Sequence, residues 1–391
     1  MTTSGAKLLR RPGEPRRSNF LELFFDLVFV VALAQLSQGL IQDLSWSGAC
    51  QTLVLLLAMW WIWTITAWTT DLYDPQQPAI QLLVTATMLG SLLMVVALPD
   101  AFGERGLVFA GVYVAMHIGR QLFLVLALRG HELQRRTIRL LFWFSVSAVP
   151  WIAGALVPGT ARGVLWTLAV AVDYTGGFLR FPTPGLGRSP RLEWSVGAEH
   201  LAERYRQLFI IALGELILVT ASSLTRSGFA ADRTVAFVVS FVGTALFWRI
   251  YIQPAGELLP AAIAAAPDPD RLARSALAAH LIMLAGIVAT AVGDELVIAH
   301  PLGHTPPAWV AILLGGPALF LAGLARFEYR VFSRVSRNRA IGLLVLAALT
   351  PAMLFSPPLL AALAAAAVLA GIAVTDAARA RGRPPEPSPP R

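Results

Sequence analysis

The sequence predicts an all-α protein, a polytopic transmembrane helical bundle of about twelve spans. Of its 391 residues, 56% are hydrophobic and 14% are charged, and the mean hydropathy is +0.65. This composition is far more apolar than a soluble domain of the same size requires. Apolar stretches also recur along nearly the whole chain at the length of a membrane span. We therefore expect the lipid bilayer to be the main surroundings of this protein.

Each span is predicted from its length. A hydrocarbon core of about 30 Å takes about 20 helical residues to cross. Twelve apolar stretches come close to this length, and only Ser356-Pro357-Pro358 separates the last two. The stretches cover residues 21–41, 50–70, 79–99, 106–128, 139–158, 163–180, 205–223, 234–252, 275–299, 308–326, 339–356 and 357–375.

The basic residues predict the orientation of the spans. The formal net charge of +8 suggests nucleic acid as one possible partner, but the 31 Lys and Arg residues alternate from loop to loop. If the N-terminus is cytoplasmic, 26 of these 31 fall on the cytoplasmic side, four lie in outside loops and Arg120 lies within a span. This is the positive-inside pattern. It predicts that both termini lie in the cytoplasm, and we expect no nucleic-acid partner.

An internal repeat is predicted from two similar helical segments 180 positions apart. Residues 29–36 read FVVALAQL and residues 209–216 read FIIALGEL, and Thr64 and Trp68 recur as Thr244 and Trp248. Chance similarity between Ala- and Leu-rich helices is the alternative. A true duplication predicts two parallel six-helix halves with a binding site where they meet. The expected segments are a basic cytoplasmic N-terminus (1–19), a first repeat (20–180), a cytoplasmic linker (181–199), a second repeat (200–376) and a disordered Pro/Arg-rich tail (377–391).

Several classes of function are not supported by any motif. No phosphate-binding loop, nucleophile elbow or HExxH pair occurs, so we expect neither an enzyme nor a pump with its own nucleotide site. The one cysteine, Cys50, cannot form an intramolecular disulfide. We expect no cofactor and no metal, and the sequence does not indicate the oligomeric state.

Ionisable residues inside the spans are the candidate site residues. A charge at membrane depth costs at least about 2.5 to 3.5 kcal/mol, so it must be paired, neutralised or hydrated. Glu22 and Asp26 are four residues apart and therefore share one helical face. Glu22 is close enough to the start of its span to reach the headgroups. Asp26 lies one turn deeper, where it either forms a structural pair or lines a polar site.

Four further residues lie deep in their spans. His117 and Arg120 are three residues apart, and Arg120 needs an acceptor because it stays charged. Asp173 and Glu215 are the candidate acceptors. If these four residues and Asp26 meet, three carboxylates face one guanidinium and one imidazole. Protonation or a bound cation would balance such a site, and separate ion pairs that hold helices together are the alternative.

The second predicted repeat opens with a group of polar residues. His200 and Glu203 are three residues apart, but two ligands are weak evidence for a metal. We expect His200, Glu203 and Arg204 to form a polar girdle at the cytoplasmic end of the span. Four other acidic residues near span ends are expected to be solvated, namely Asp71, Asp74, Asp294 and Glu295.

Two blocks of the sequence resemble the bacterial low temperature requirement A family. The first is EPRR at residues 14–17 followed by LELFFDLVFV at 21–30, and the second is HLAER at 200–204 with IALGE at 211–215. The resemblance implies a polytopic inner-membrane protein of a family named for a role in growth in the cold, and it supplies no mechanism. Residues 25–29, FDLVF, also look like the F-S-D-G-V-F motif of endolysosomal potassium channels. Phe24-Phe25 replaces Phe-Ser there, and the second copy lacks the aspartate.

Three functions follow as hypotheses. The first is a transporter of a small solute, coupled to protons or to a monovalent cation, with its site at Asp26, His117, Arg120, Asp173 and Glu215. The second is a cation channel. The third is a sensor or scaffold whose cytoplasmic arginines contact anionic lipid, for which the candidates are Arg330, Arg334, Arg337 and Arg339.

Overall fold

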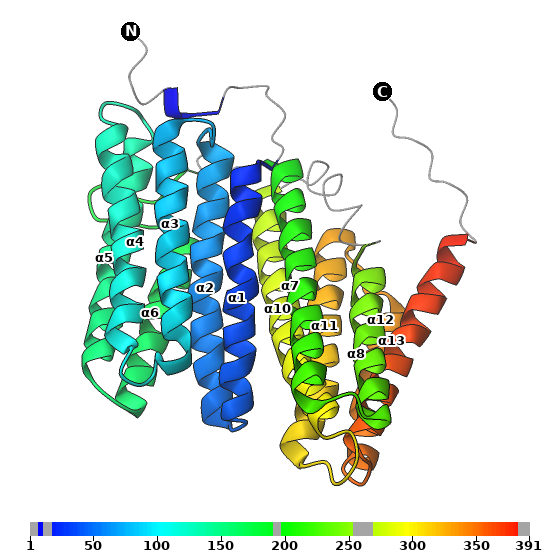
Figure 1. Cartoon of the computed structure of the whole chain (residues 1–391). Helices are drawn as coiled ribbons and strands as arrows, with labels where there is room; N and C mark the ends of the chain where they lie inside the picture. The colour runs from blue at the N-terminus through cyan, green and yellow to red at the C-terminus, as the bar shows by residue number, and fades with distance from the viewer. Residues whose placement is uncertain (1–6, 11–17, 191–196, 253–268, 382–391) are drawn as a thin grey trace. The chain divides into compact units, whose positions relative to one another are not determined.

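A computed structural model describes residues 7–10, 18–190, 197–252 and 269–381 of the chain, and their regular structure is helical. Figure 1 shows the long helices lying side by side within each part of the molecule. They are α1 (Phe20–Gln42), α2 (Trp46–Leu72), α3 (Pro78–Ala97), α4 (Gly106–Ala127), α5 (Gln134–Leu156), α6 (Thr160–Phe178), α7 (Ala198–Ser227), α8 (Ala231–Tyr251), α10 (Pro269–Ala299), α11 (Pro307–Phe332), α12 (Arg337–Met353) and α13 (Pro358–Arg381).

These twelve helices coincide with the twelve predicted spans, which confirms the fold class. Ten of the described helices are long and apolar enough to cross a membrane. The other two are shorter or more polar. Helix α12 has 17 residues, and α6, with 19, includes Arg162 and Asp173. Length and composition therefore support a multi-pass membrane protein.

Helix ends follow local sequence signals. Proline occupies the first position of α3 and of α11, where its missing N–H costs no helical hydrogen bond. Ser45 caps α2 by accepting a hydrogen bond from the N–H of Gly48 at 3.2 Å. The last two helices are divided where the sequence predicts, because α13 begins at Pro358.

The chain forms two compact units. The first comprises Met1–Ile211 with Asp268–Ala273, and the second comprises Ala212–Pro267 with Arg274–Arg391. Within the first unit α5 packs against α4 and α6, and α6 also packs against α2. Within the second unit α12 packs against α11 and α13, and α13 also packs against α8. The duplication and the predicted segment boundaries stay predictions.

The two units differ in how their helices pack. In the first unit the core is built from large aromatic side chains, and Trp60, Trp63, Trp151 and Trp166 are fully buried. In the second unit α10 and α11 approach closely at a glycine. A Cβ atom at Gly286 would lie 2.5 Å from the backbone nitrogen of Phe320. Small residues allow such close approach between membrane helices.

Candidate functional site

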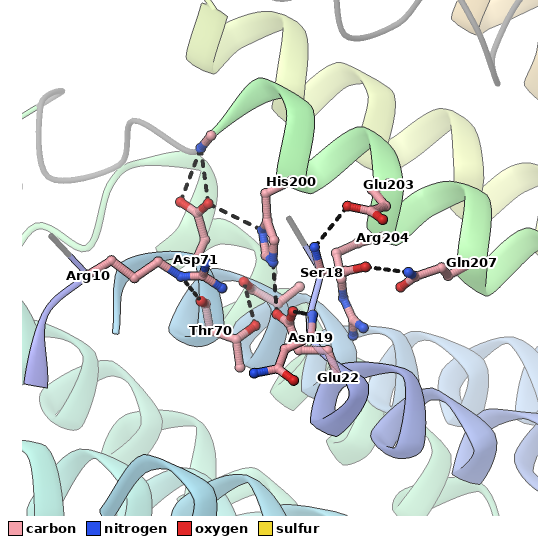
Figure 2. A network of polar contacts seen from close by, with 12 residues as sticks. Arg10, Ser18, Asn19, Glu22, Thr70, Asp71, His200, Glu203, Arg204 and Gln207 are labelled. Atoms are coloured by element: carbon pink, nitrogen blue, oxygen red, sulfur yellow. Dashed lines mark hydrogen bonds and ion pairs between the residues drawn. The ribbon is translucent and has the colours of Figure 1, made fainter. Parts of the chain in front are cut away.

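Three helix ends meet in the first unit: the start of α1, the end of α2 and the start of α7. Figure 2 shows how polar side chains from these ends point toward one another. Five ionisable side chains form what we call the α1–α2–α7 network. They are Glu22, Asp26, Asp71, His200 and Arg204, and each is at most 3% exposed.

The carboxylates of α1 share one face of the helix, as their spacing predicts. Glu22 lies in the first turn, where its Oε2 accepts a hydrogen bond from the N–H of Asn19 at 2.8 Å. This contact also supplies an acceptor for a free N–H at the start of the helix. Asp26 lies one turn further along and is fully buried. Both carboxylates therefore face protein rather than lipid.

His200 lies between two carboxylates. Its Nε2 is 2.8 Å from Oε1 of Glu22, and its Nδ1 is 3.2 Å from Oδ1 of Asp71. A neutral imidazole donates from one nitrogen and accepts at the other, whereas an ionised carboxylate can only accept. The Nε2 contact is a hydrogen bond, and the Nδ1 contact is a close approach at ion-pair distance. A protonated imidazole would compensate one of the two carboxylates.

Arg204 is the partner of Asp26. Its Nη2 donates to Oδ1 of Asp26 at 2.6 Å, and the same oxygen accepts from Nε1 of Trp63 at 2.9 Å. The guanidinium also lies over the Trp63 ring, 5.7 Å from its centroid. Charge-assisted hydrogen bonds of this length are among the strong ones in proteins. They join α1, α2 and α7 at a point where water is excluded.

The structure overturns the expectation that Asp71 is solvated. Helix α2 continues to Leu72, so Asp71 lies in its last turn and is 3% exposed. Its two carboxylate oxygens accept from the N–H of Gly197, directly before α7, at 3.2 and 3.1 Å. Negative charge is favoured at a helix N-terminus. The sequence alone did not indicate this partner, because Gly197 lies 126 positions from Asp71 along the chain.

The residues around the edge of the α1–α2–α7 network are either uncharged or partly exposed. Oε2 of Glu203 accepts from the N–H of Ser18 at 2.8 Å, and Gln207 donates to the Ser18 hydroxyl. Burial raises the pKa of Tyr73, just beyond the end of α2, to about 12. Tyr73 therefore stays a neutral phenol and adds no charge. Asp74 lies in the following turn and accepts from the N–H of Gln76 at 2.9 Å.

The network contains more negative than positive charge. If every carboxyl group is ionised and His200 is protonated, three carboxylates face two cations. This is the charge count that the sequence predicts for a central site, but its members are different. Asp26 is the residue common to both sets, while Glu22, Asp71, His200 and Arg204 take the places of the others.

The predicted residues of α4 and α6 have other partners in the first unit. Arg120 donates from Nη2 to the hydroxyls of Thr66 and Thr87, at 2.9 and 3.2 Å, and forms no ion pair with a carboxylate of the described residues. Asp173 accepts from the Tyr113 hydroxyl at 2.7 Å. Neutral hydroxyls on neighbouring helices thus supply the hydrogen bonds for which we had expected an ion pair.

His117 and Glu215 are both deeply buried. His117 packs between aromatic rings, with centroids 4.5 Å from Tyr113 and 4.3 Å from Phe144. Its ring nitrogens have no hydrogen-bond partner among the described residues. Glu215 is fully buried and belongs to the second unit. Its meeting with the residues of the first unit stays a prediction.

The second unit corrects three further expectations. Asp294 and Glu295 lie within α10, which continues to Ala299, and they are 7% and 8% exposed rather than solvated in a loop. Arg339, expected to contact lipid headgroups, is buried. Its Nε lies 3.2 Å from Oε1 of Glu328 and its Nη1 lies 2.7 Å from Oδ2 of Asp376. Carboxylates inside the protein therefore compensate the positive charge of Arg339.

Some predicted features lie outside the described residues. These are the EPRR segment at 14–17, most of the predicted disordered tail, which begins at residue 377, and part of the linker. In the part of the chain that is described, no group of three or more His, Cys, Asp and Glu side chains has the arrangement of a metal site.

The chain was compared with known families, proteins and structures. The model of the family "Bacterial low temperature requirement A protein (LtrA)" matches residues 17–374. An uncharacterized protein of Rhizobium meliloti (strain 1021) is 39% identical over 323 residues, which cover 82% of this chain and 78% of that protein. No solved structure matches the chain. The family match runs from before α1 into α13 and contains the α1–α2–α7 network, and the chain therefore belongs to the bacterial low temperature requirement A family.

Proposed function

We propose that this protein is a transporter of a small solute in the bacterial plasma membrane, coupled to protons or to a monovalent cation. We propose no catalytic activity for it. The observation that carries the proposal is the α1–α2–α7 network, in which three buried carboxylates face one guanidinium and one imidazole.

The argument is electrostatic. Buried charges remain in an apolar bundle when they are paired or when a mobile ion compensates them. Arg204 compensates Asp26, which leaves Glu22 and Asp71 to share His200. The charge that this pair of carboxylates faces therefore depends on whether the His200 imidazole is protonated. A proton or small cation that binds there and leaves again would couple the charge state of the network to the ion gradient.

The experiment uses purified protein in liposomes that contain the pH dye pyranine. A pH gradient is imposed, and amino acids, sugars and alkali-metal ions are added one at a time. We expect at least one solute to move dye-reported protons with saturable kinetics. Asp71→Asn should reduce that coupled rate about tenfold or more, since a hydrogen bond to a charged group contributes about 1.5 to 3 kcal/mol.

Asp74→Asn is the matched control, because Asp74 lies three residues from Asp71 and its carboxylate bonds within its own turn. Its coupled rate should equal that of the unmodified protein. A non-saturating conductance in planar bilayers would favour a cation channel instead. If no solute moves, and the cellular phenotype persists in Glu22→Gln and Asp71→Asn, a sensor or scaffold is the better explanation.

A further inference from the structure

Two consecutive carboxylates on α10 of the second unit have opposite surroundings. Glu295 accepts a hydrogen bond from Nη2 of Arg226 at 2.7 Å, so its charge is compensated. Asp294 forms no ion pair within the described ranges, and its Oδ2 has no hydrogen-bond partner there. Asp294 and Glu295 can therefore be compared directly, because they are adjacent residues of the same helix with different partners.

The side chains that line the space beside Asp294 are apolar except for the hydroxyls of Ser240 and Thr290. Ser240 of α8 lies beside the carboxyl group. The next residue of α10, Glu295, is paired with Arg226. An ionised carboxylate without a cation at membrane depth costs at least about 2.5 to 3.5 kcal/mol. A protonated carboxyl group avoids that cost and can donate a hydrogen bond.

A small cavity adjoins this carboxyl group. Its volume is about 30 Å³, and α8, α10, α11 and α13 all contribute to its wall. Asp294, Ser240 and Thr290 supply the polar side chains of the wall, and Asp294 alone among the lining residues is titratable. A cavity needs about 10 to 15 Å³ to hold one water molecule, which also needs polar partners. Both conditions are met here.

Asp173 of the first unit is a buried carboxyl group with more hydrogen-bond donors around it. Its Oδ2 accepts from the Tyr113 hydroxyl at 2.7 Å and from Nε1 of Trp151 at 3.4 Å, while its Oδ1 has no hydrogen-bond partner within the described ranges. Asp294 has no comparable pair of donors among the described residues, and a cavity adjoins it instead.

We propose that Asp294 is a proton-binding site of the second unit. The carboxyl group holds a proton in the apolar interior and exchanges it with water that enters the cavity. In that step the O–H bond of the acid breaks, the electron pair stays on the carboxylate, and the proton passes to the water. The inference deepens the proposed coupling and rests on it for its role in transport, although the proton site itself does not require that any solute be carried.

Infrared difference spectroscopy of the full-length protein in lipid nanodiscs tests the site directly. Spectra are recorded as the pH is raised, without any solute or gradient. We expect the C=O band of a protonated carboxyl group to be lost on alkalinisation, about tenfold for each pH unit beyond its midpoint. The band should be missing in Asp294→Asn and unchanged in Glu295→Gln, the matched control.

A second measurement covers the case in which Asp294→Asn folds poorly. Dicyclohexylcarbodiimide, an apolar reagent for protonated carboxyl groups, should modify Asp294 in the unmodified protein and in Ser240→Ala. A band that persists in a folded Asp294→Asn protein would overturn the proposal. So would protection of Asp294 by Na⁺ at constant pH, which would indicate a metal cation. If the infrared band of Asp294 is present but no solute moves together with protons in the liposome assay, the proposed transport function is contradicted and the proton site still stands.

Discussion

The α1–α2–α7 network and the Asp294 cavity accommodate buried carboxylates in different ways. In the network each acid is within 3.2 Å of an imidazole or guanidinium nitrogen. At Asp294 no described cation is in reach, and a small cavity takes its place. The first arrangement joins three helix ends by charge. The second leaves a group that can change its protonation state with little effect on its neighbours.

This difference bears on stability and on titration. A residue in a network of ion pairs changes the charge balance of its partners in a low dielectric when it gains or loses a proton. A residue without an ion pair affects its neighbours less. We therefore expect substitutions in the network to be more destabilising than substitutions at Asp294. The following variants test that contrast by thermal unfolding in detergent.

The largest effect is expected for Arg204→Met. It leaves Asp26 buried with Trp63 as its one remaining described donor, and breaking a buried pair costs about 3 to 5 kcal/mol. The midpoint of unfolding, followed by intrinsic fluorescence, should fall sharply. The double variant Arg204→Met with Asp26→Leu should recover much of the loss. A double variant no more stable than the single one would show that the ion pair is not what the first change removed.

His200→Gln should be the next most damaging. An amide carries no charge and cannot replace an imidazole that lies between Glu22 and Asp71, and unsatisfied buried partners cost about 1 to 3 kcal/mol. The control is His131→Gln, because His131 lies in the turn before α5 and accepts a single hydrogen bond from the N–H of Leu133 at 3.2 Å. Equal midpoints for the two variants would contradict the bridging role of His200.

Arg226→Ala should have a small effect on stability. Its side chain is 58% exposed, and an exposed ion pair contributes about 0 to 1 kcal/mol. The change nevertheless sharpens the comparison, because it removes the Arg226 guanidinium from beside Glu295. We expect the infrared band of protonated carboxyl groups to grow in this variant, since a nearby cation favours the ionised form of a carboxyl group. An unchanged band would show that solvent alone compensates Glu295.

Asp294→Asn should change stability least of all. The amide has nearly the shape of a protonated carboxyl group and carries no charge, so the free energy of unfolding should stay within about 1 kcal/mol of the original. Asp26→Asn provides the contrast, because it leaves Arg204 unpaired and should be clearly destabilising. If both variants unfold at similar temperatures, the two regions do not differ in the way that their contacts indicate.

Sequence reasoning succeeded where the signal was local. The length of the apolar stretches predicted all twelve helices, and the four-residue spacing of Glu22 and Asp26 predicted their shared face. It failed where the outcome depended on packing between helices. Asp71 was expected to be solvated because it follows its predicted span, but α2 continues to Leu72 and Asp71 is buried. Asp294 lies inside its predicted span, and the neighbouring helices bury it instead of leaving it solvated.

By itself, the sequence determined that this chain is a helical membrane protein of a particular family and that a few acids are buried in it. Hydropathy over about 20 consecutive residues and helical periodicity over one or two turns are both local in the sequence, so both can be read without knowing the fold. Tertiary structure alone decided the partners. His200 and Arg204 are each 178 positions from the acids of α1 that they contact, and Asp294 has no such partner in the described structure. Coulomb and hydrogen-bond energies depend on distances of a few ångströms in space, and packing between distant helices sets those distances.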